Sequence, residues 1–278
     1  TLNYVGVPTI NTFYVAFNMA NVPKPVRQAM AYVMNQQQMV DQVFKGRGQS
    51  AYHFTPPSIY PGGAEAYRSH AQDSYPYGYN ETQIDQAKQV MEDAGYGPDN
   101  RYELGWVQYQ SDTWLSMAQI LRDQLSSAYI DMQIEQATFS TLLKRGREGN
   151  TEAYTLGWIA DWPRADNFLN LLYPPDTDTS LEAPQSYINW QSVDSDAKQQ
   201  ATQAWETVEG NYQPTDDARA AREDAYVQIE EANWEDVGFV NVYHRVDELF
   251  YYDTVKDWTP MGGMGFSRQK LNELTVER

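Results

Sequence analysis

The strongest constraint on the fold is an alternation of two hydrophobic periods between residues 80 and 159. Segments with an apolar residue at every second position are typical of half-buried strands, and they cover 103–109, 131–137 and 152–158. Segments with helical spacing of apolar residues cover 80–95, 112–128 and 138–148. Strands and helices of this length in alternation predict an α/β domain with a mixed or largely parallel sheet flanked by helices.

The flanking segments extend this pattern. We expect a strand over 12–19 and a helix over 26–43, broken in two and ending near Gly46. Residues 47–80 are rich in Pro, Gly, Ser and Tyr without a usable period, and we expect a long irregular surface segment there. Two exposed helices are predicted over 194–209 and 214–235, followed by one long strand or a hairpin over 237–252.

Several side chains are expected to cap helices. Asp112 and Asp166 each precede a helical pattern, so we interpret both as N-cap residues. Asn80 begins an Asn-Glu-Thr glycosylation sequon, but it also stands where a helix needs its N-cap, and we favour the cap. The run MGGMGF at 261–266 has no strand before it and no helix after it, so it is not a nucleotide-binding motif.

Composition limits the partners and the chemistry. The net charge of -18 argues against nucleic acid and against an anionic membrane surface. Acidic residues spread along the chain indicate a surface that stays hydrated in concentrated salt, as in halophilic proteins; an ordinary acidic protein is the alternative. The absence of cysteine excludes disulfides and thiolate sites. The start TLNYVGVPTI lacks an initiating methionine and a signal pattern, so we expect a fragment of a longer protein.

The run GWIADWPRADNF at 157–168 places one carboxylate, Asp161, among aromatic and apolar residues at the carboxyl end of a predicted strand. Ligands of open α/β sheets bind at such ends. With Trp158 and Trp162 nearby, the carboxylate suits an ammonium group. The alternative is a turn in which Asp161 accepts backbone amides and the tryptophans belong to the core.

Catalytic patterns are weak. The three histidines, His53, His70 and His244, are scattered and lack the spacing of zinc ligands. The serines lack a nucleophile elbow, and no phosphate-binding loop is present. We therefore expect neither an enzyme nor a cofactor, with one rival: a pocket of aspartate and tryptophan also describes the cleft of a glycoside hydrolase.

Several segments resemble one family, the peptide-type solute-binding proteins of ABC importers. NTFYVAFNM at 11–19, with the helix VRQAMAYVM and the loop ending in TPPS, is similar to the family's "FN" strand, "VRQA" helix and proline loop. QAKQVMEDAGY at 86–96 looks like its "A..LL.EAGY". GWIADWPRADNFL resembles its "GW.AD.PDPDNFL", and VGFVNVYHR at 237–245 its "IPLYYR" strand. The matches run in order over most of the chain.

The resemblance implies a periplasmic-binding-protein type II-like fold. It implies that residues 1–255 form the carboxyl-terminal ligand-binding lobe, with hinge strands near both ends. Residues 256–278 would form a tail that returns to an amino-terminal lobe absent from this chain, so that half of the ligand cleft is missing.

The resemblance also implies a site. In peptide-binding members the aspartate of "GW.AD" pairs with the ligand's α-amino group, which carries over to Asp161, and the tryptophan before it lines the pocket, which carries over to Trp158. A tyrosine of the "YYR" strand touches the peptide in some members, and here His244 stands in that place beside Tyr243. The full predicted set of ligand-binding residues is Asp161, Trp158, Trp162, Ile159, Tyr243, His244, Trp106 and Tyr109.

These expectations combine into one function: the binding lobe of an extracellular or periplasmic, membrane-anchored protein that delivers peptides to an ABC permease. We expect a monomer that uses no cofactor and no metal. The same scaffold with an oligosaccharide or a metal complex as ligand is the alternative, and a sugar would stack on Trp106, Trp158 and Trp162.

Overall fold

A seven-stranded mixed sheet forms the centre of the computed structural model, which describes residues 1–256 and 275–277. The strand order is β1-β7-β2-β6-β4-β5, with the short β3 paired to β7. Only the β4–β5 and β4–β6 pairs in this sheet are parallel, which confirms the mixed sheet. The strands are β1 Leu2–Pro8, β2 Asn11–Phe17, β3 Gly48–Ser50, β4 Tyr102–Tyr109, β5 Ile130–Ala137, β6 Ala153–Ile159 and β7 Phe239–Tyr252.

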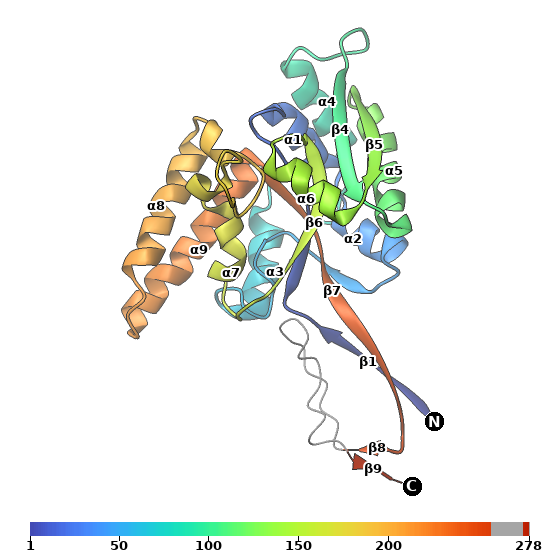
Figure 1. Cartoon of the computed structure of the whole chain (residues 1–278), viewed down its shortest axis with the longest axis vertical. Coiled ribbons are helices and arrows are strands. Elements are labelled where there is room, and N and C mark those ends of the chain that lie inside the picture. The colour runs from blue at the N-terminus through green and yellow to red at the C-terminus, as the bar shows by residue number, and fades with distance from the viewer. Residues whose placement is uncertain (257–274, 278) are drawn as a thin grey trace.

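Helices cover both faces of this sheet (Figure 1). One core joins the sheet to α1, α4 and α5, and the other joins it to α6, α7, α8 and α9. None of the described helices combines the length and apolar character needed to cross a bilayer. The α-helices are α1 Lys24–Val33, α2 Gln36–Gln38, α3 Gly63–Ser74, α4 Ile84–Asp93, α5 Asp112–Ser126, α6 Phe139–Arg147, α7 Asp166–Leu169, α8 Asp196–Gly210 and α9 Asp216–Asp236.

Most predicted elements are confirmed to within a few residues. The helix predicted over 26–43 is indeed broken, because α1 ends at Val33 and a short α2 continues as a π-helix over Met39–Val43. The predicted strand or hairpin over 237–252 is the single strand β7. The run MGGMGF lies outside the described residues, as does most of the segment expected to form a tail.

The prediction of a long irregular surface segment over 47–80 was wrong. It contains β3 and the twelve-residue α3, and it buries large aromatic side chains such as Tyr52 and Phe54. Only Tyr67 and Ala71 of α3 are buried, so this helix lacks the apolar stripe that reveals most amphipathic helices. The segment is held in place by these aromatic side chains, which follow no periodic pattern in the sequence.

The predictions of three helix caps were also wrong. The side chain of Ser111, not Asp112, accepts the capping hydrogen bond of α5 from the amide of Trp114. Asn80 has a left-handed backbone and accepts a hydrogen bond from the Tyr52 hydroxyl, 2.6 Å away. Asp166 lies one residue inside α7 and uses its carboxylate on neighbouring side chains, as described below.

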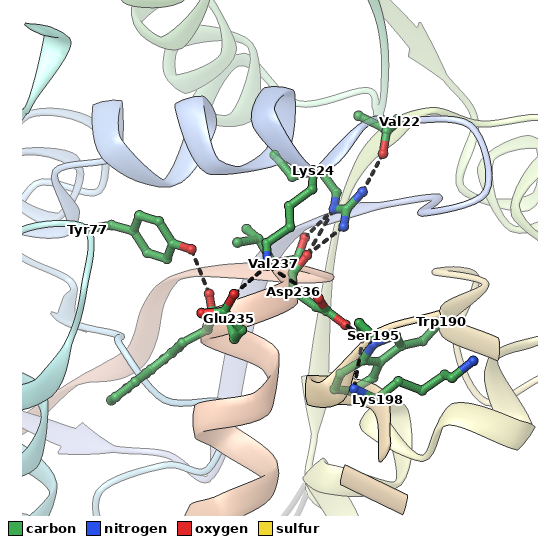
Figure 2. A network of polar contacts seen from close by, with 11 residues as sticks. Val22, Lys24, Tyr77, Trp190, Ser195, Lys198, Glu235, Asp236 and Val237 are labelled. Atoms are coloured by element: carbon green, nitrogen blue, oxygen red, sulfur yellow. Dashed lines mark hydrogen bonds and ion pairs between the residues drawn. The ribbon is translucent and has the colours of Figure 1, made fainter. Parts of the chain in front are cut away.

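The carboxyl end of α9 is held by buried polar contacts (Figure 2). Asp236 accepts hydrogen bonds from Trp190 Nε1, at 2.8 Å, and from the Ser195 hydroxyl. The buried guanidinium of Arg27 donates to the backbone carbonyls of Asp236 and Val237. Val237 then takes a left-handed φ of 53°. These contacts satisfy the last carbonyls of the helix and turn the chain into β7.

A two-stranded ribbon extends from the body of the molecule (Figure 1). It consists of β1 paired antiparallel with the second half of β7, from Leu2 opposite Tyr252 to Pro8 opposite Val246. The aromatic rings of Tyr4 and Phe250 contact each other on it, with centroids 5.4 Å apart, and both side chains are exposed. Beyond the ribbon, β8 Val255–Lys256 pairs with β9 Thr275–Val276. The division at residues 255 and 256 stays a prediction.

Candidate functional site

The sheet brings two of the predicted site residues to one edge. Strands β4 and β6 are parallel neighbours, so Tyr109 at the end of β4 and Ile159 at the end of β6 lie at the same edge of the sheet. Ile159 and Trp162 are each 43% exposed there. This is the edge at which open α/β sheets bind ligands.

Asp161 lies in the loop that follows β6, and its side chain is exposed. The amide of Asn167 donates from Nδ2 to Asp161 Oδ2 at 3.4 Å. The Asn167 Oδ1 accepts from the backbone N–H of Asp161 at 3.0 Å and from Trp158 Nε1 at 3.2 Å. Within the described chain Asp161 forms no ion pair, and its carboxylate accepts no backbone amide. The alternative of a turn held by the Asp161 carboxylate was therefore wrong.

The loop is fixed from its other end by Asp166, whose carboxylate is buried. Asp166 accepts from Trp162 Nε1 at 2.8 Å and forms an ion pair with Arg164. The guanidinium carbon of Arg164 lies 5.3 Å from the centre of the Tyr212 ring, which links the loop to the end of α8. These contacts hold Trp162 in place although its ring faces solvent.

A pocket of about 440 Å³ lies on the face of the sheet covered by α5. Two of the predicted residues, Tyr109 and Tyr243, line it together. Trp114 at the start of α5 donates a hydrogen bond from Nε1 to the Tyr109 hydroxyl at 2.6 Å, which fixes both aromatic side chains. The lining residues are Phe44, Arg47, Tyr109, Ser111, Thr113, Trp114, Tyr243, Arg245, Val246, Asp247 and Glu248.

Stacked aromatic rings form one wall of this pocket. The ring of Tyr243 lies between Phe44, with centroids 3.8 Å apart, and Phe13, with centroids 4.8 Å apart. Phe13 fits because its neighbour on β6 is Gly157, where a Cβ would lie 2.4 Å from the Phe13 ring. The glycine of the GWIADW run is thus needed for packing of the wall.

A β-bulge decides which side chain of β7 faces the pocket. Phe13 of β2 lies opposite Tyr243, whereas the next residue, Tyr14, lies opposite Asn241, so that Val242 is the extra residue. Such a bulge re-aims the side chains that follow it. Tyr243 consequently faces the pocket, and His244 faces the opposite side of the sheet.

Two predicted site residues therefore belong to the interior. His244 is 2% exposed and contacts the Asn11 carbonyl and the Tyr67 hydroxyl, at 2.8 and 3.0 Å. Burial lowers its pKa to about 4. Trp106 is fully buried under α5, and its Nε1 donates to Gln108 at 3.0 Å. Neither side chain presents a surface to a ligand, so the prediction was wrong for both.

The charges of the pocket are mixed. Arg245 Nε lies 3.0 Å from Asp247 Oδ1, while Arg47 and Glu248 stand at the rim. Two guanidinium groups balance two carboxylates here, although the whole chain carries a charge of -18. Aromatic walls with both signs of charge suit a ligand that itself carries both signs, or a neutral polar one.

Sequence reasoning missed several residues of this region. Phe44 and Arg47 lie between the π-helix and β3, Trp114 lies at the start of α5, and no local motif marks them as pocket residues. Asn167 stands inside the quoted run, and its polar side chain on a helix with buried neighbours was the available signal. Among the described residues, no group of three or more histidine or acidic side chains is placed to hold a metal ion.

Comparisons with known proteins agree with this architecture. Residues 1–180 match the family model described as bacterial extracellular solute-binding proteins, family 5 Middle. The dipeptide-binding protein of Escherichia coli is 24% identical over 196 residues, which cover 68% of this chain and 34% of that protein. Heme-binding protein A of Haemophilus influenzae is 29% identical over 171 residues, covering 59% of this chain and 29% of that protein.

Solved structures show the same fold. The Escherichia coli murein tripeptide binding protein MppA matches with a TM-score of 0.73 at 18% identity, over 98% of this chain and 49% of that one. HbpA2 from Haemophilus parasuis matches with a TM-score of 0.75 at 17% identity, over 100% of this chain and 50% of that one. The chain thus spans about a third of the length of these curated relatives and about half of these structures. With the family model matched over residues 1–180, the chain belongs to the family 5 bacterial extracellular solute-binding proteins.

Proposed function

We propose that this chain is a ligand-binding lobe of an extracytoplasmic solute-binding protein that takes up peptides for an ABC permease. The observation that carries the proposal is the Asp161 carboxylate. Its Oδ2 is held by Asn167, and within the described chain its Oδ1 has no hydrogen-bond partner. A fixed anion with an open oxygen at the ligand-binding edge of the sheet suits the α-ammonium group of a peptide.

The surroundings fit a peptide chain beyond its amino end. Trp162 offers an exposed aromatic face beside Asp161, and Ile159 an exposed aliphatic one. The pocket with Tyr109 and Tyr243 adds aromatic walls and balanced charges. Roomy, partly polar pockets accommodate side chains of variable identity, as a peptide importer requires. Curated relatives are named as binding proteins for dipeptides, di- and tripeptides, glutathione and heme, which agrees with binding instead of catalysis.

The proposal includes the arrangement of the whole protein. Residues 1–255 would form one lobe, with the ribbon of β1 and β7 as the hinge toward a second lobe that completes the cleft and closes over the ligand. The complete protein would act outside the cytoplasm as a monomer, anchored to the membrane that holds the permease. Residues 256–278 would return toward the second lobe.

The test is Asp161→Asn in the complete gene product. This change keeps the shape of the side chain and removes its charge, so we expect the affinity for a free di- to pentapeptide to fall by about 2 to 4 kcal/mol, as for a charge pair that loses one member. The free energy of unfolding should change little, because the carboxylate accepts one side-chain hydrogen bond that an amide oxygen also accepts. Calorimetric titration and urea unfolding measure the two quantities.

Asp217→Asn is the matched control, because Asp217 is an exposed aspartate in the first turn of α9 and, within the described chain, forms no hydrogen bond or ion pair with the Asp161 loop. The Asp217→Asn variant should bind peptide with the affinity of the parent. An N-acetylated peptide, which lacks the ammonium group, should bind the parent weakly and lose little more on Asp161→Asn. Equal affinity of the parent for free and acetylated peptides would contradict the role of Asp161.

Other ligands remain as alternatives on the same scaffold. The exposed ring of Trp162 would also stack on a sugar, and one relative is named for heme. A thermal-shift screen of di- to pentapeptides, cello-oligosaccharides, heme and a nickel complex distinguishes these classes, because a ligand that binds only the folded state raises the unfolding temperature. Turnover of a chromogenic glycoside would instead establish a glycoside hydrolase and remove the binding proposal.

A further inference from the structure

Asn167 is a buried polar residue at the point where the Asp161 loop enters α7. It is 1% exposed, and its neighbours Phe168 and Leu169 are fully buried in the core under α8 and α9. Its amide group reaches back to the loop and contacts both Asp161 and Trp158. A buried side chain that serves the proposed amine anchor and its aromatic neighbour at once needs an explanation beyond helix formation.

The orientation of the Asn167 amide follows from its partners. The backbone N–H of Asp161 and the indole N–H of Trp158 can only donate, so the atom that both of them face, at 3.0 and 3.2 Å, is the oxygen. The amide NH2 group must then face the Asp161 carboxylate, where it lies 3.4 Å from Oδ2.

We propose that Asn167 is a positioning residue that locks Asp161 and Trp158 into the geometry that receives the ligand's ammonium group. The inference rests on the proposed function of Asp161. A carboxylate on an exposed loop would otherwise sample several rotamers, and ordering it at the moment of binding would weaken the affinity. Asn167 donates to one carboxylate oxygen and leaves the other open for the ligand.

The packing around Asn167 makes it rigid enough for this role. Phe168 and Leu169 fix its backbone from the core side, and the ion pair of Asp166 with Arg164 fixes the loop on the solvent side. The indole of Trp158 is held by the same amide and packs against the core of that face. The three groups therefore move as one unit, so the anchor and its aromatic neighbour keep a fixed spacing.

The experiment measures how strongly the complete gene product prefers a free tripeptide over its N-acetylated form. In Asn167→Leu, which keeps the number of heavy atoms and the branching at Cγ but makes none of the three hydrogen bonds, we expect this preference to fall about tenfold, as when a charged group loses a hydrogen bond that supports it. Asn167→Ser is the second variant, because its smaller side chain avoids any strain that prevents Asn167→Leu from folding. The leucine side chain has no donor, and the serine hydroxyl ends one bond short of the position of Asn167 Nδ2, so neither variant restores the hydrogen bond to Asp161 Oδ2.

Asn233→Ser is the matched control. Asn233 is also a buried asparagine, and its amide bridges the backbone N–H and carbonyl of Phe239, away from Asp161. The Asn233→Ser substitution should lower the unfolding temperature and leave the preference for the free peptide unchanged, because a general loss of rigidity weakens the binding of both peptides alike.

The outcomes separate the two proposals. If the parent shows no preference for the free peptide, the role of Asp161 is wrong and the role of Asn167 falls with it. If the parent shows the preference and the folded Asn167 variants keep it at full size, the positioning role is wrong while the proposed function stands. A loss of preference in the Asn167 variants, with Asn233→Ser unchanged, supports the positioning role.

Discussion

At the scale of single residues, His244 shows how a polar side chain serves the interior. Its Nδ1 faces the Asn11 carbonyl, which only accepts, so the proton of the neutral ring resides on Nδ1. Its Nε2 then accepts from the Tyr67 hydroxyl. Both ring nitrogens are satisfied in the neutral form, and burial lowers the pKa to about 4. Protonation would put an unpaired charge into the core.

This depressed pKa predicts a contribution to acid unfolding. The unfolded chain binds a proton at His244 below a pKa of 6.5, whereas the folded chain does so only below about 4. The contribution of His244 to stability is therefore complete above pH 6.5 and is lost as the pH falls toward 4. Over that window the free energy of unfolding of His244→Gln should fall less steeply with decreasing pH than that of the parent, and the two slopes should differ by about 1 kcal/mol per pH unit. Urea unfolding at several pH values measures it, and parallel curves for parent and variant would refute the assignment.

The pKa shift of Glu230 changes stability with pH in the opposite direction. The effect of His244 must therefore be measured as a difference between the parent and His244→Gln. Its carboxylate is fully buried and accepts from the backbone N–H groups of Phe54 and Thr55, each at 2.7 Å. Burial raises its pKa to about 7. The folded chain therefore holds this proton more tightly than the unfolded chain, whose pKa is near 4.5, and stability is lost as the pH rises from 4.5 through 7. The pH profile of the parent alone thus contains two opposing slopes.

At the scale of elements, close packing of β2 against β6 positions the pocket wall. Phe13 lies across Gly157 of the neighbouring strand and stacks on Tyr243 from the strand on its other side. The bulge at Val242 is what brings Tyr243 opposite Phe13. Three strands therefore contribute to one aromatic wall, and the wall depends on a glycine in the middle of β6.

Gly157→Ala tests this arrangement. The added methyl group would lie 2.4 Å from the Phe13 ring, so the ring must shift, and we expect a loss of about 1 to 3 kcal/mol in the free energy of unfolding, as for overpacked cores. Gly210→Ala is the control, since no atom of the described residues lies within 4 Å of a Cβ placed at the end of α8, and there the change should be neutral or stabilising. Urea unfolding of both variants decides, and equal stability of the two would exclude the close contact.

At the scale of the whole molecule, the charge of -18 is the dominant electrostatic feature. Most ion pairs among the described residues are exposed and contribute little each, for example Arg219 with Asp216. Repulsion among the excess carboxylates therefore weakens the folded state when salt is low.

This charge predicts salt-dependent stability. We expect the unfolding temperature to rise as potassium chloride increases toward about 1 M, because the screening length falls from about 10 Å at 0.1 M to about 3 Å at 1 M. Sucrose at matched osmolality is the control, since it screens no charge. An unfolding temperature that stays level in salt, or that rises equally in sucrose, would show that the acidic surface is not an adaptation to salt.

The sequence by itself determined most elements of the fold and one feature of the site. Apolar periodicity predicted strands β4, β5 and β6 with their helices, because burial of one face leaves a local repeat in the sequence. The run at 157–168 placed Asp161 at the end of a strand for the same local reason. No local repeat marks α3, whose burial depends on scattered aromatic side chains, and its helix was missed.

Only the tertiary structure decided which side chains meet. The pocket joins Phe44, Tyr109 and Tyr243, which are far apart in the chain and meet through the strand order. The bulge at Val242 sets which residue of β7 faces the pocket and sends His244 into the core. Register and strand order arise from contacts between distant segments, and a shift of one residue exchanges the two faces of a strand. That information does not reside in any local pattern.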